Sequence, residues 1–403
     1  MDREVFIIDA VRTPIGKYKG KLKHVRPDDL GANVLKGLVE RNPELPLELI
    51  DDVIFGNANG AGEDNRNVAR MSLLLAGFPK EISGTTVNRL CGSGLDAVSL
   101  AARSILSGEC EVVIAGGVES MTRAPLVMKK PDSEFPRGDM TVHDTTIGWR
   151  FINPEMSRRY GTDSMPQTAE NVASRFGITR EEQDEFAYQS QQKAKKAIED
   201  DKFNDEIIPV CFTDKKGNEH IVDCDEHPRF DTTIEKLSVL SPIFEGGTVT
   251  AGNSTGVNDG ASAVLLVSGD FARKHGLRPL VKYAGSATAG VEPAVMGLGP
   301  IHSTKKLMAK KGWRSSDFDL IEINEAFASQ SLECIKQLDF DMDKVNVNGG
   351  AIALGHPLGA SGARILTTLI HEMKRRKARR GLATMCIGVG QGISVVVENV
   401  YES

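Results

Sequence analysis

Strand-like and helix-like segments alternate along most of this chain, and this alternation constrains the fold more than any other feature of the sequence. Residues 3–11 form an apolar, β-branched run typical of a buried strand. A helical pattern follows to about Glu40, and Asp28 or Asp29 can cap it. Further strand-like runs are DDVIFGNA, CEVVIAGG, ASAVLLVS and, in the second half of the chain, LVKYAG, DLIEIN, NVNGG, LATMCIGV and ISVVVENV. The alternation predicts parallel βαβ units and an α/β fold class.

The α/β pattern is interrupted by one long segment, residues 121–249. This segment is polar and irregular, and it holds one long helical tract that Thr179 can cap, with Glu182 at the capping-box position. A chain of 403 residues is long enough for two or three domains. The second α/β region resembles the first in its order of strand, glycine-rich loop and helix. This similarity favours two similar sheets stacked face to face. We therefore predict a first α/β half, an inserted loop domain and a second α/β half, with bounds of 1–120 plus 250–270, 121–249 and 271–403.

The composition excludes several classes of protein. A formal net charge of −6 gives no reason to expect nucleic acid or an anionic membrane as the main partner. No apolar run reaches membrane-spanning length. The six cysteines show neither the Cys/His spacing of a metal site nor the pattern of a disulfide framework, so we expect no metal. The first residues enter a strand without a signal-peptide or transit-peptide pattern, and we expect a cytoplasmic protein.

The stretch from Thr85 to Gly108 carries the first candidate reactive group. A β-prone run ends at Leu90, Cys91 follows at once, and a helix with one apolar face then runs to a glycine stop. Unpaired amides and the positive end of the helix dipole would favour the thiolate of Cys91 at this place. The alternative, favoured on this stretch alone, is a buried cysteine that acts as a small hydrophobic residue.

Three more stretches break the packing pattern at predicted strand ends: NEAFAS at Asn324, GGAIALGHPLGASGAR around His356, and CIGVGQG from Cys386. Open α/β folds place ligands at such ends. Each residue also has a structural alternative, because Asn324 can cap a helix, His356 can bond a neighbouring loop, and Cys386 can be a buried strand residue. The GVGQG run resembles a dinucleotide-binding loop, but a strand follows it where that motif requires a helix. We therefore reject the interpretation of this run as a dinucleotide-binding loop.

Two thiols and one imidazole at glycine-rich strand ends indicate acyl chemistry. An imidazole can take the proton of a thiol nucleophile, which then holds an acyl group as a thioester. A second thiol, with a pKa tuned near neutrality, can move a proton at carbon or sulfur. This division of roles suits thioester substrates, because their leaving group is itself a thiol.

These motifs resemble those of the thiolase family. NRLCGSG, GGVESM, GTVTAGNSTGVNDGA, NEAFA, GGAIALGHPLGASGAR and CIGVGQG occur in the family's order along essentially the whole chain. The resemblance implies a thiolase fold, with two duplicated βαβαβαββ halves in a five-layer αβαβα arrangement and an inserted loop domain. It also implies a homodimer or homotetramer, acyl-CoA and coenzyme A as substrates, and no permanently bound cofactor.

The resemblance implies a catalytic role for each matching residue. Cys91 would be the nucleophile that takes the acyl group, and His356 would activate it and contribute to an oxyanion hole. Asn324 would position a water in that hole. Cys386 would protonate the leaving carbanion equivalent in thiolysis, or remove the α-proton in condensation. The backbone amides of Cys91 and Gly388 would form a second oxyanion hole, whose donors are worth about 3–4 kcal/mol each.

Other matching positions lie on the substrate side. Arg229 matches an arginine that contacts the coenzyme A nucleotide, and Thr255 matches a serine near the pantetheine. Ala251 precedes Thr255 in the same motif and is expected at the coenzyme A site. Met165 and Phe327 are expected to be packing residues that can line the pocket wall.

Two stretches, GEDNRNVARM and DTTIGWRFINP, resemble the 3-oxoadipyl-CoA thiolases within the degradative acetyl-CoA acyltransferases. Such enzymes cleave a 3-oxoacyl-CoA with coenzyme A to acetyl-CoA and a shortened acyl-CoA, in aromatic-compound degradation or fatty-acid β-oxidation. The far carboxylate of a dicarboxylic acyl chain needs a cation. The candidates for this cation are Arg150, Arg158 and Arg159. Each of them can instead belong to a solvated basic face.

Two alternative functions remain open. The first is a biosynthetic acetyl-CoA acetyltransferase that condenses two acetyl-CoA molecules. Ser164 counts against it, because those enzymes carry a histidine at the matching position. The second is a catalytically silent thiolase-like carrier of acyl-CoA, which would not need both Cys91 and Cys386.

Overall fold

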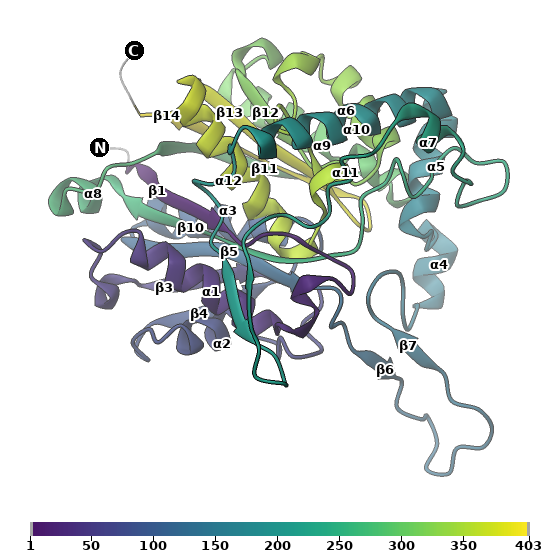
Figure 1. Cartoon of the computed structure of the whole chain (residues 1–403), viewed down its shortest axis with the longest axis horizontal. Helices are drawn as coiled ribbons and strands as arrows, with labels where there is room; N and C mark the ends of the chain where they lie inside the picture. Colours follow the sequence, from purple (N-terminus) through teal and green to yellow (C-terminus); the bar gives the residue numbers. More distant parts are fainter. Residues whose placement is uncertain (1–2, 401–403) are drawn as a thin grey trace.

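The computed structural model describes residues 3–400, which form two similar α/β halves (Figure 1). The first half consists of β1 (Val5–Arg12), α1 (Pro27–Glu40), β3 (Asp52–Gly56), α2 (Val68–Leu75), β4 (Ser83–Val87), α3 (Ser93–Ser107), β5 (Val112–Ser120) and β10 (Asn258–Ser268). The second consists of β11 (Val281–Gly290), α9 (Gly299–Lys311), β12 (Leu320–Ile323), α10 (Ala328–Gln337), α12 (Leu358–Arg376), β13 (Arg380–Ile387) and β14 (Gln391–Asn399). Short elements complete these halves: β2 (Gly16–Lys17), α8 (Gly269–His275), α11 (Ala351–Leu354) and the 3₁₀ turns η1 (Lys21–His24), η2 (Leu47–Leu49), η3 (Pro293–Leu298), η4 (Ser315–Asp317) and η5 (Met342–Lys344).

Each half contributes one region of β-sheet. The strand order is β4-β3-β5-β10-β1 in the first region and β11-β14-β13-β12 in the second. The regions join where Phe6 and Ile7 of β1 pair with β11. In the first region β3 runs parallel to β4 and β5, as the alternation of strands and helices predicts. β10 follows the insertion in sequence but pairs with β1 and β5, so the chain returns to the first half.

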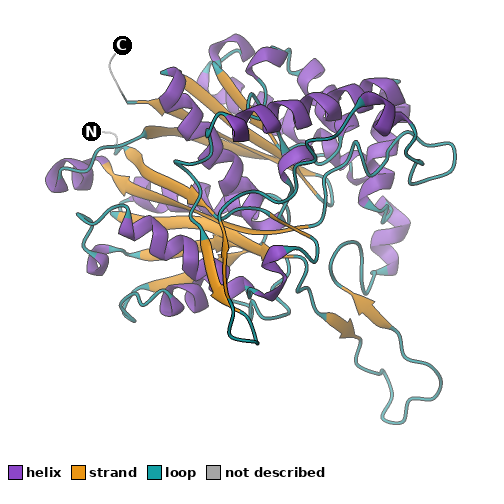
Figure 2. Ribbon diagram, in the orientation of Figure 1, coloured by secondary structure: helices purple, strands orange, loops and turns teal. Residues whose placement is uncertain are grey.

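Helices α3 and α12 form a middle layer between the two sheet regions (Figure 2). One hydrophobic core joins side chains of both helices, such as Val98 and Leu366, to both sheets, through residues such as Val113 and Val395. Burying such a side chain contributes about 1.5–3 kcal/mol relative to exposure. A second core lies between α1, α2 and the outer face of the first sheet, and a third between α9, α10 and the outer face of the second. The predicted five-layer αβαβα arrangement is therefore confirmed.

The two middle helices approach each other closely at glycines. A Cβ atom added to Gly94, in the first turn of α3, would lie 2.7 Å from the carbonyl oxygen of Gly359 in the first turn of α12. Real Cβ atoms do not approach an oxygen so closely, and only residues without a side chain permit this contact. The N-terminal ends of α3 and α12 therefore lie side by side.

Helix ends were predicted with mixed success. Gly108 follows α3 with φ of 86°, in the left-handed conformation that ends a helix at glycine, as predicted. The prediction that Asp28 or Asp29 caps α1 is wrong. Arg26 is the residue before the helix, and the Asp28 carboxylate lies within the first turn, where it accepts a hydrogen bond from Arg26 Nε at 2.9 Å.

The predicted strand NVNGG, residues 346–350, is absent from the described structure. Val345 makes one isolated bridge to β12, and the backbone then turns, with φ of 44° at Asn346. The side chain of Asn346 takes the place of a strand partner. Its Oδ1 accepts from the Ile323 amide at 2.9 Å, and its Nδ2 donates to the Ile323 carbonyl at 2.9 Å. The second half thus lacks the equivalent of β4.

The insertion is more ordered than its sequence predicts. It contains β6 (Leu126–Met128), β7 (Val142–Asp144), α4 (Pro154–Tyr160), α5 (Met165–Phe176), α6 (Arg180–Glu199), β8 (Val210–Thr213), β9 (Glu219–Val222) and α7 (Ile234–Ser238). Only α6 was predicted as a helix, and its capping box of Thr179 and Glu182 is confirmed. The β6–β7 hairpin extends away from the body (Figure 1). Within residues 3–400, no helix combines the length and apolar composition needed to cross a bilayer.

A buried ion cluster fastens the insertion to β1. Arg12 donates from Nε to Glu206 at 2.6 Å and from its two terminal nitrogens to Asp225 at 2.7 and 2.9 Å. All three side chains are fully buried. Removing one partner of such a cluster leaves an uncompensated charge in the interior, at a cost of about 3–5 kcal/mol.

Candidate active site

Cys91 lies between the end of β4 and the start of α3. Leu90 before it has φ of 47°, a left-handed conformation that is uncommon for a residue with a side chain. The backbone amides of Gly388 and of Cys91 itself lie close enough to the sulfur to favour its ionised form and so lower its pKa. Gly388 is in the β13–β14 turn, followed by Val389 with φ of 64°. Such backbone is costly for a β-branched residue and concentrates at functional sites.

The thiol of Cys91 is protonated at neutral pH in this structure. Burial raises its pKa to about 11, and the two amides offset this only in part. The expectation that the start of α3 keeps Cys91 as a thiolate is therefore wrong, because desolvation outweighs the helix end. A neighbouring base has to take the proton when Cys91 reacts.

His356 has a defined tautomer. The Ser361 hydroxyl lies 2.8 Å from the Pro357 carbonyl oxygen, to which it must donate, and 2.6 Å from His356 Nδ1. Nδ1 is therefore the protonated nitrogen, and Nε2 is left with a free lone pair. Burial, and then the charge of Arg364, lowers the pKa of His356 to about 3. The imidazole is neutral and able to accept a proton at Nε2.

Asn324 faces this imidazole. It follows β12, and its Nδ2 lies 3.5 Å from His356 Nε2. The prediction that Asn324 caps the next helix is wrong, because α10 begins at Ala328 with Phe327 as the capping residue. The Oδ1 of Asn324 is buried and has no partner within residues 3–400. A water held between Asn324 and a ligand would satisfy such an atom.

Cys386 is at the end of β13 and is almost fully buried. It packs in an apolar cluster with Phe327 and Met165. Burial raises the pKa of Cys386 above its usual range, and the neighbouring Cys91 raises it further. The two thiols are thus close enough to interact, and the predicted pKa near neutrality for Cys386 is not found.

A cavity of about 240 Å³ opens over Cys91 and Gly388. Met165 and Trp149 contribute to its apolar wall. One carboxylate also lines it, that of Glu119. Three backbone amides, of Ala58, Asn59 and Gly359, donate to Glu119, and burial raises its pKa to about 7.

The three candidate arginines lie in different settings. Arg150 lines the cavity over Cys91. Arg158 and Arg159 instead lie on α4, where both are exposed and pair with Glu155. Those two therefore belong to a solvated basic face. Of the three arginines, Arg150 alone reaches the cavity over Cys91, which we call the acyl cavity because an acyl chain is expected there.

Arg229 and Ala251 lie at a second, smaller cavity. Ile352 of α11 also lines it, four residues before His356. Thr255 lines neither cavity, and its hydroxyl donates to the Ala351 carbonyl at 2.9 Å. Leu358, two residues after His356, lines the cavity over Cys91, so segment 352–358 reaches both cavities.

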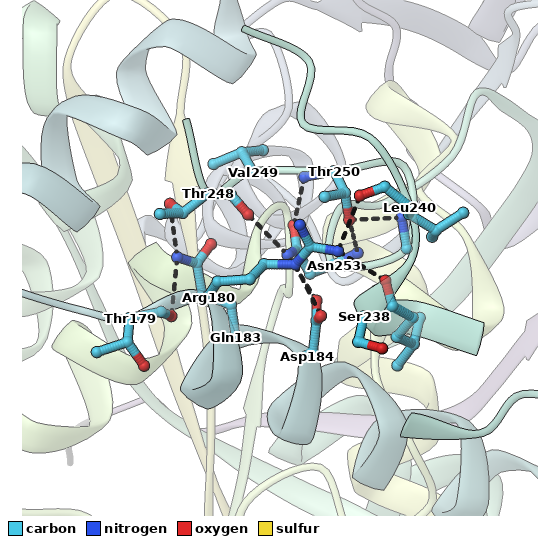
Figure 3. A network of polar contacts seen from close by, with 12 residues as sticks. Thr179, Arg180, Gln183, Asp184, Ser238, Leu240, Thr248, Val249, Thr250 and Asn253 are labelled. Carbon is cyan, nitrogen blue, oxygen red and sulfur yellow. Dashed lines mark hydrogen bonds and ion pairs between the residues drawn. The ribbon is translucent and has the colours of Figure 1, made fainter. Parts of the chain in front are cut away.

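The insertion fixes the loop that carries Ala251 and Thr255 (Figure 3). Asn253 donates to Asp184 of α6 at 3.0 Å and accepts from the Thr250 amide at 2.8 Å. Arg180 holds Asp184 in turn, at 2.7 Å. The network explains why a long polar helix packs on the core: its side chains hold the loop around Asn253 in place.

Three residues at the site were not singled out from the sequence. Ser361 sets the tautomer of His356, Glu119 holds two loops at the cavity, and Asn258 accepts from the His356 amide at 2.9 Å. Asn258 also lies against Gly355, where an added Cβ would come within 2.6 Å of it. Each residue stands in a recognised motif, but the contacts of Glu119 and Asn258 reach across the fold, to Gly359 and to His356.

Known proteins resemble the whole chain. The family models "Thiolase, N-terminal domain" and "Thiolase, C-terminal domain" match residues 5–270 and 277–399. The chain is 55% identical to a beta-ketoadipyl-CoA thiolase of Pseudomonas aeruginosa, over 99% of this chain and all of that one. It is 54% identical to the 3-oxoadipyl-CoA/3-oxo-5,6-dehydrosuberyl-CoA thiolase of Escherichia coli, with the same coverage. Human mitochondrial 3-ketoacyl-CoA thiolase in complex with CoA superposes with a TM-score of 0.92, at 40% identity, over 99% of this chain and 98% of that chain. The chain therefore belongs to the thiolase family of acyltransferases.

Proposed function

We propose that this protein cleaves 3-oxoadipyl-CoA with coenzyme A to acetyl-CoA and succinyl-CoA. The observation that carries the choice of substrate is the position of Arg150, an arginine in the same cavity as the thiol of Cys91. The names of the relatives that are more than half identical to this chain support the same substrate. Coenzyme A enters as a substrate.

The first half of the reaction breaks a carbon–carbon bond. The sulfur of Cys91 attacks the C3 carbonyl of the substrate as His356 Nε2 takes the thiol proton. The C2–C3 bond then breaks, its electron pair goes to C2 of the departing acetyl-CoA, and Cys386 supplies the proton there. The succinyl group remains on Cys91 as a thioester.

The second half transfers the acyl group. The thiolate of Cys386 takes the proton of the coenzyme A thiol, whose sulfur attacks the thioester on Cys91. The departing Cys91 sulfur recovers its proton from His356. Both thiols end in the protonated forms in which their raised pKa values hold them at rest.

Two sets of donors would stabilise the negative oxygen in these steps. We assign one to His356 and a water on Asn324, and the other to the backbone amides of Cys91 and Gly388. The effect of the latter pair on the Cys91 thiol supports this assignment, since both amides lie near enough to the sulfur to lower its pKa. Preorganised donors of this kind are typically worth about 3–4 kcal/mol each.

We assign the coenzyme A end of the site to the second cavity. Arg229 is exposed there and free to meet a phosphate, beside Ala251. Thr255 would border the pantetheine arm between the two cavities, and Met165 and Phe327 would form the apolar wall near the thiols.

Arg150→Ala is expected to lower kcat/KM for 3-oxoadipyl-CoA by about ten- to a hundredfold, because hydrogen bonds to a charged group contribute roughly 1.5–3 kcal/mol. Acetoacetyl-CoA has no far carboxylate, so its kcat/KM should change by less than about threefold. Steady-state thiolysis of both substrates measures the effect, with Arg158→Ala as the matched control. Equal losses of kcat/KM on both substrates would show that Arg150 does not select for the far carboxylate.

We further propose a homodimer or homotetramer. Strand β4 pairs only with β3 among the described strands, so one of its edges is open. Beside it on α2, Leu74 and Leu75 are 44% and 45% exposed. An open edge next to exposed leucines is a surface on which two copies can pair about a two-fold axis.

Replacing Leu74 and Leu75 with glutamate is expected to shift the protein to monomers, because two like-charged faces would have to meet. Light scattering after gel filtration measures the mass. An unchanged oligomer would exclude this surface, and a monomeric unmodified protein would exclude the assembly.

The proposal also includes the domain bounds and the location of the protein in the cell. The domain bounds 1–120 plus 250–270, 121–249 and 271–403 are supported by the return of β10 to the first sheet. A cytoplasmic location is supported by the six cysteines, all free thiols and two of them exposed, which suits a reducing compartment.

A further inference from the structure

Arg150 carries a charge without a carboxylate partner in the acyl cavity. No ion pair joins it to any acidic residue of the range 3–400, whereas Arg158 and Arg159 share Glu155. Its one side-chain hydrogen bond runs from Nη2 to the amide oxygen of Asn59, at 3.3 Å. A guanidinium has five N–H donors in a fixed plane, so most of them remain available to a ligand.

Asn59 is itself held in one orientation. Its Nδ2 donates to the Thr145 carbonyl at 3.2 Å and to the Thr145 hydroxyl at 2.9 Å. Because a carbonyl oxygen only accepts, Nδ2 must face Thr145, and Oδ1 must face Arg150. Thr145 is buried, and its hydroxyl donates to the Pro125 carbonyl at 2.6 Å, so the support is rigid.

The backbone of Asn59 is tied to the catalytic frame. Its amide donates to Glu119 at 3.1 Å, and the same carboxylate accepts from the Gly359 amide at 2.9 Å at the start of α12. Glu119 is 3% exposed. The chain of contacts from Gly359 through Glu119 and Asn59 therefore sets the place of the Arg150 guanidinium relative to the reactive residues.

We propose that Asn59 is a positioning residue that determines substrate specificity: it orients Arg150 so that the cavity selects 3-oxoacyl chains ending in a carboxylate. This proposal rests on the proposed function. A bidentate carboxylate requires the guanidinium plane to be aimed, not merely present. Asn59 fixes the orientation of the guanidinium plane, and Arg150 provides the positive charge.

The test compares 3-oxoadipyl-CoA with 3-oxohexanoyl-CoA, which has the same six-carbon chain without the far carboxylate. Asn59→Leu, of nearly equal size, is expected to raise KM for 3-oxoadipyl-CoA about tenfold and to change kcat by less than about twofold. For 3-oxohexanoyl-CoA both constants should stay within about twofold. A merely structural role would reduce the turnover of both substrates together, and that result would overturn the proposal.

The double variant Asn59→Leu/Arg150→Ala tests whether Asn59 acts through Arg150. Its kcat/KM for 3-oxoadipyl-CoA should match that of Arg150→Ala within about twofold, since the two changes remove one interaction. Fully multiplicative losses would overturn the proposal.

A second substitution keeps the test decisive if the leucine variant is unstable. Asn59→Asp retains the size of the side chain and presents a carboxylate that pairs with Arg150. It is expected to lower kcat/KM for 3-oxoadipyl-CoA about thirtyfold while sparing 3-oxohexanoyl-CoA. Unchanged selectivity in this variant contradicts the role of Asn59. Equal use of the two substrates by the unmodified protein would instead overturn both the proposal and the substrate assigned to the enzyme.

Discussion

Cys91→Ala is expected to abolish acylation of the protein and to lower kcat at least about 10⁴-fold, as losses of catalytic nucleophiles do. The thiol of Cys91 is flanked by the Gly388 amide, and the cavity of about 240 Å³ opens over it. Mass spectrometry of the intact protein after incubation with acetyl-CoA measures the acyl group directly. Cys386, the neighbouring thiol, is almost fully buried, so we expect no acylation there.

Cys211→Ala is the matched control for this experiment. Cys211 is an exposed free thiol on β8, away from both cavities. Its replacement should leave acylation and turnover unchanged. Retention of a mass shift on the Cys91→Ala protein, or its loss on the Cys211→Ala protein, would contradict the assignment of the nucleophile.

Cys386→Ser is expected to accumulate the acyl-enzyme while thiolysis falls about 10²–10⁴-fold, the usual contribution of a positioned acid or base. With acetyl-CoA as donor, coenzyme A leaves as a thiolate and needs no acid, because its thiol has an ordinary pKa of about 8.5. The steps at carbon do need one, and a serine hydroxyl is a far weaker acid than a thiol. Single-turnover acylation followed by mass, beside steady-state thiolysis, separates the two effects.

The roles of the two thiols are distinguishable by pattern. A Cys386→Ser protein that fails to acylate, together with a Cys91→Ala protein that does acylate, would exchange the roles assigned here. Cys334→Ala is a control for the loss of a buried thiol near the site. Cys334 is buried, and Cys386 lies near enough to raise the pKa of Cys334. Within residues 3–400 the Cys334 thiol donates to the Gly297 carbonyl alone. It should keep the unmodified pattern of acylation and turnover.

Local sequence patterns were sufficient for the regular part of the fold. The apolar face of α3 and the glycine stop at Gly108 are contained within about one helix length, and the structure has both. The capping box at Thr179 is likewise a contact between near neighbours in sequence. The prediction of a strand around Asn346 was wrong because a contact with a distant part of the chain determines the backbone conformation there. The side chain of Asn346 pairs with Ile323, more than twenty residues earlier.

The candidate reactive residues could be singled out from their motifs in the sequence, but their ionisation could not be predicted from it. A helix N-terminus beside Cys91 predicts a lowered thiol pKa, whereas burial under the β13–β14 turn raises it. That burial depends on the docking of the second half against the first, which no local pattern reports. Asn59 was missed because it meets Arg150 across 91 residues of sequence. Ser361 was missed although it lies five residues after His356, because the spacing alone does not show that its hydroxyl bonds the imidazole.

The glycine contact between α3 and α12 also bears on how the site is assembled during synthesis. Cys91 belongs to the half that leaves the ribosome first, while Asn324, His356 and Cys386 all belong to the half that leaves last. Large chains generally fold part by part, beginning with the part that is synthesised first. The contact of Gly94 with Gly359 needs both halves, so the surroundings of Cys91 are complete only after α12 has been synthesised and has packed on α3.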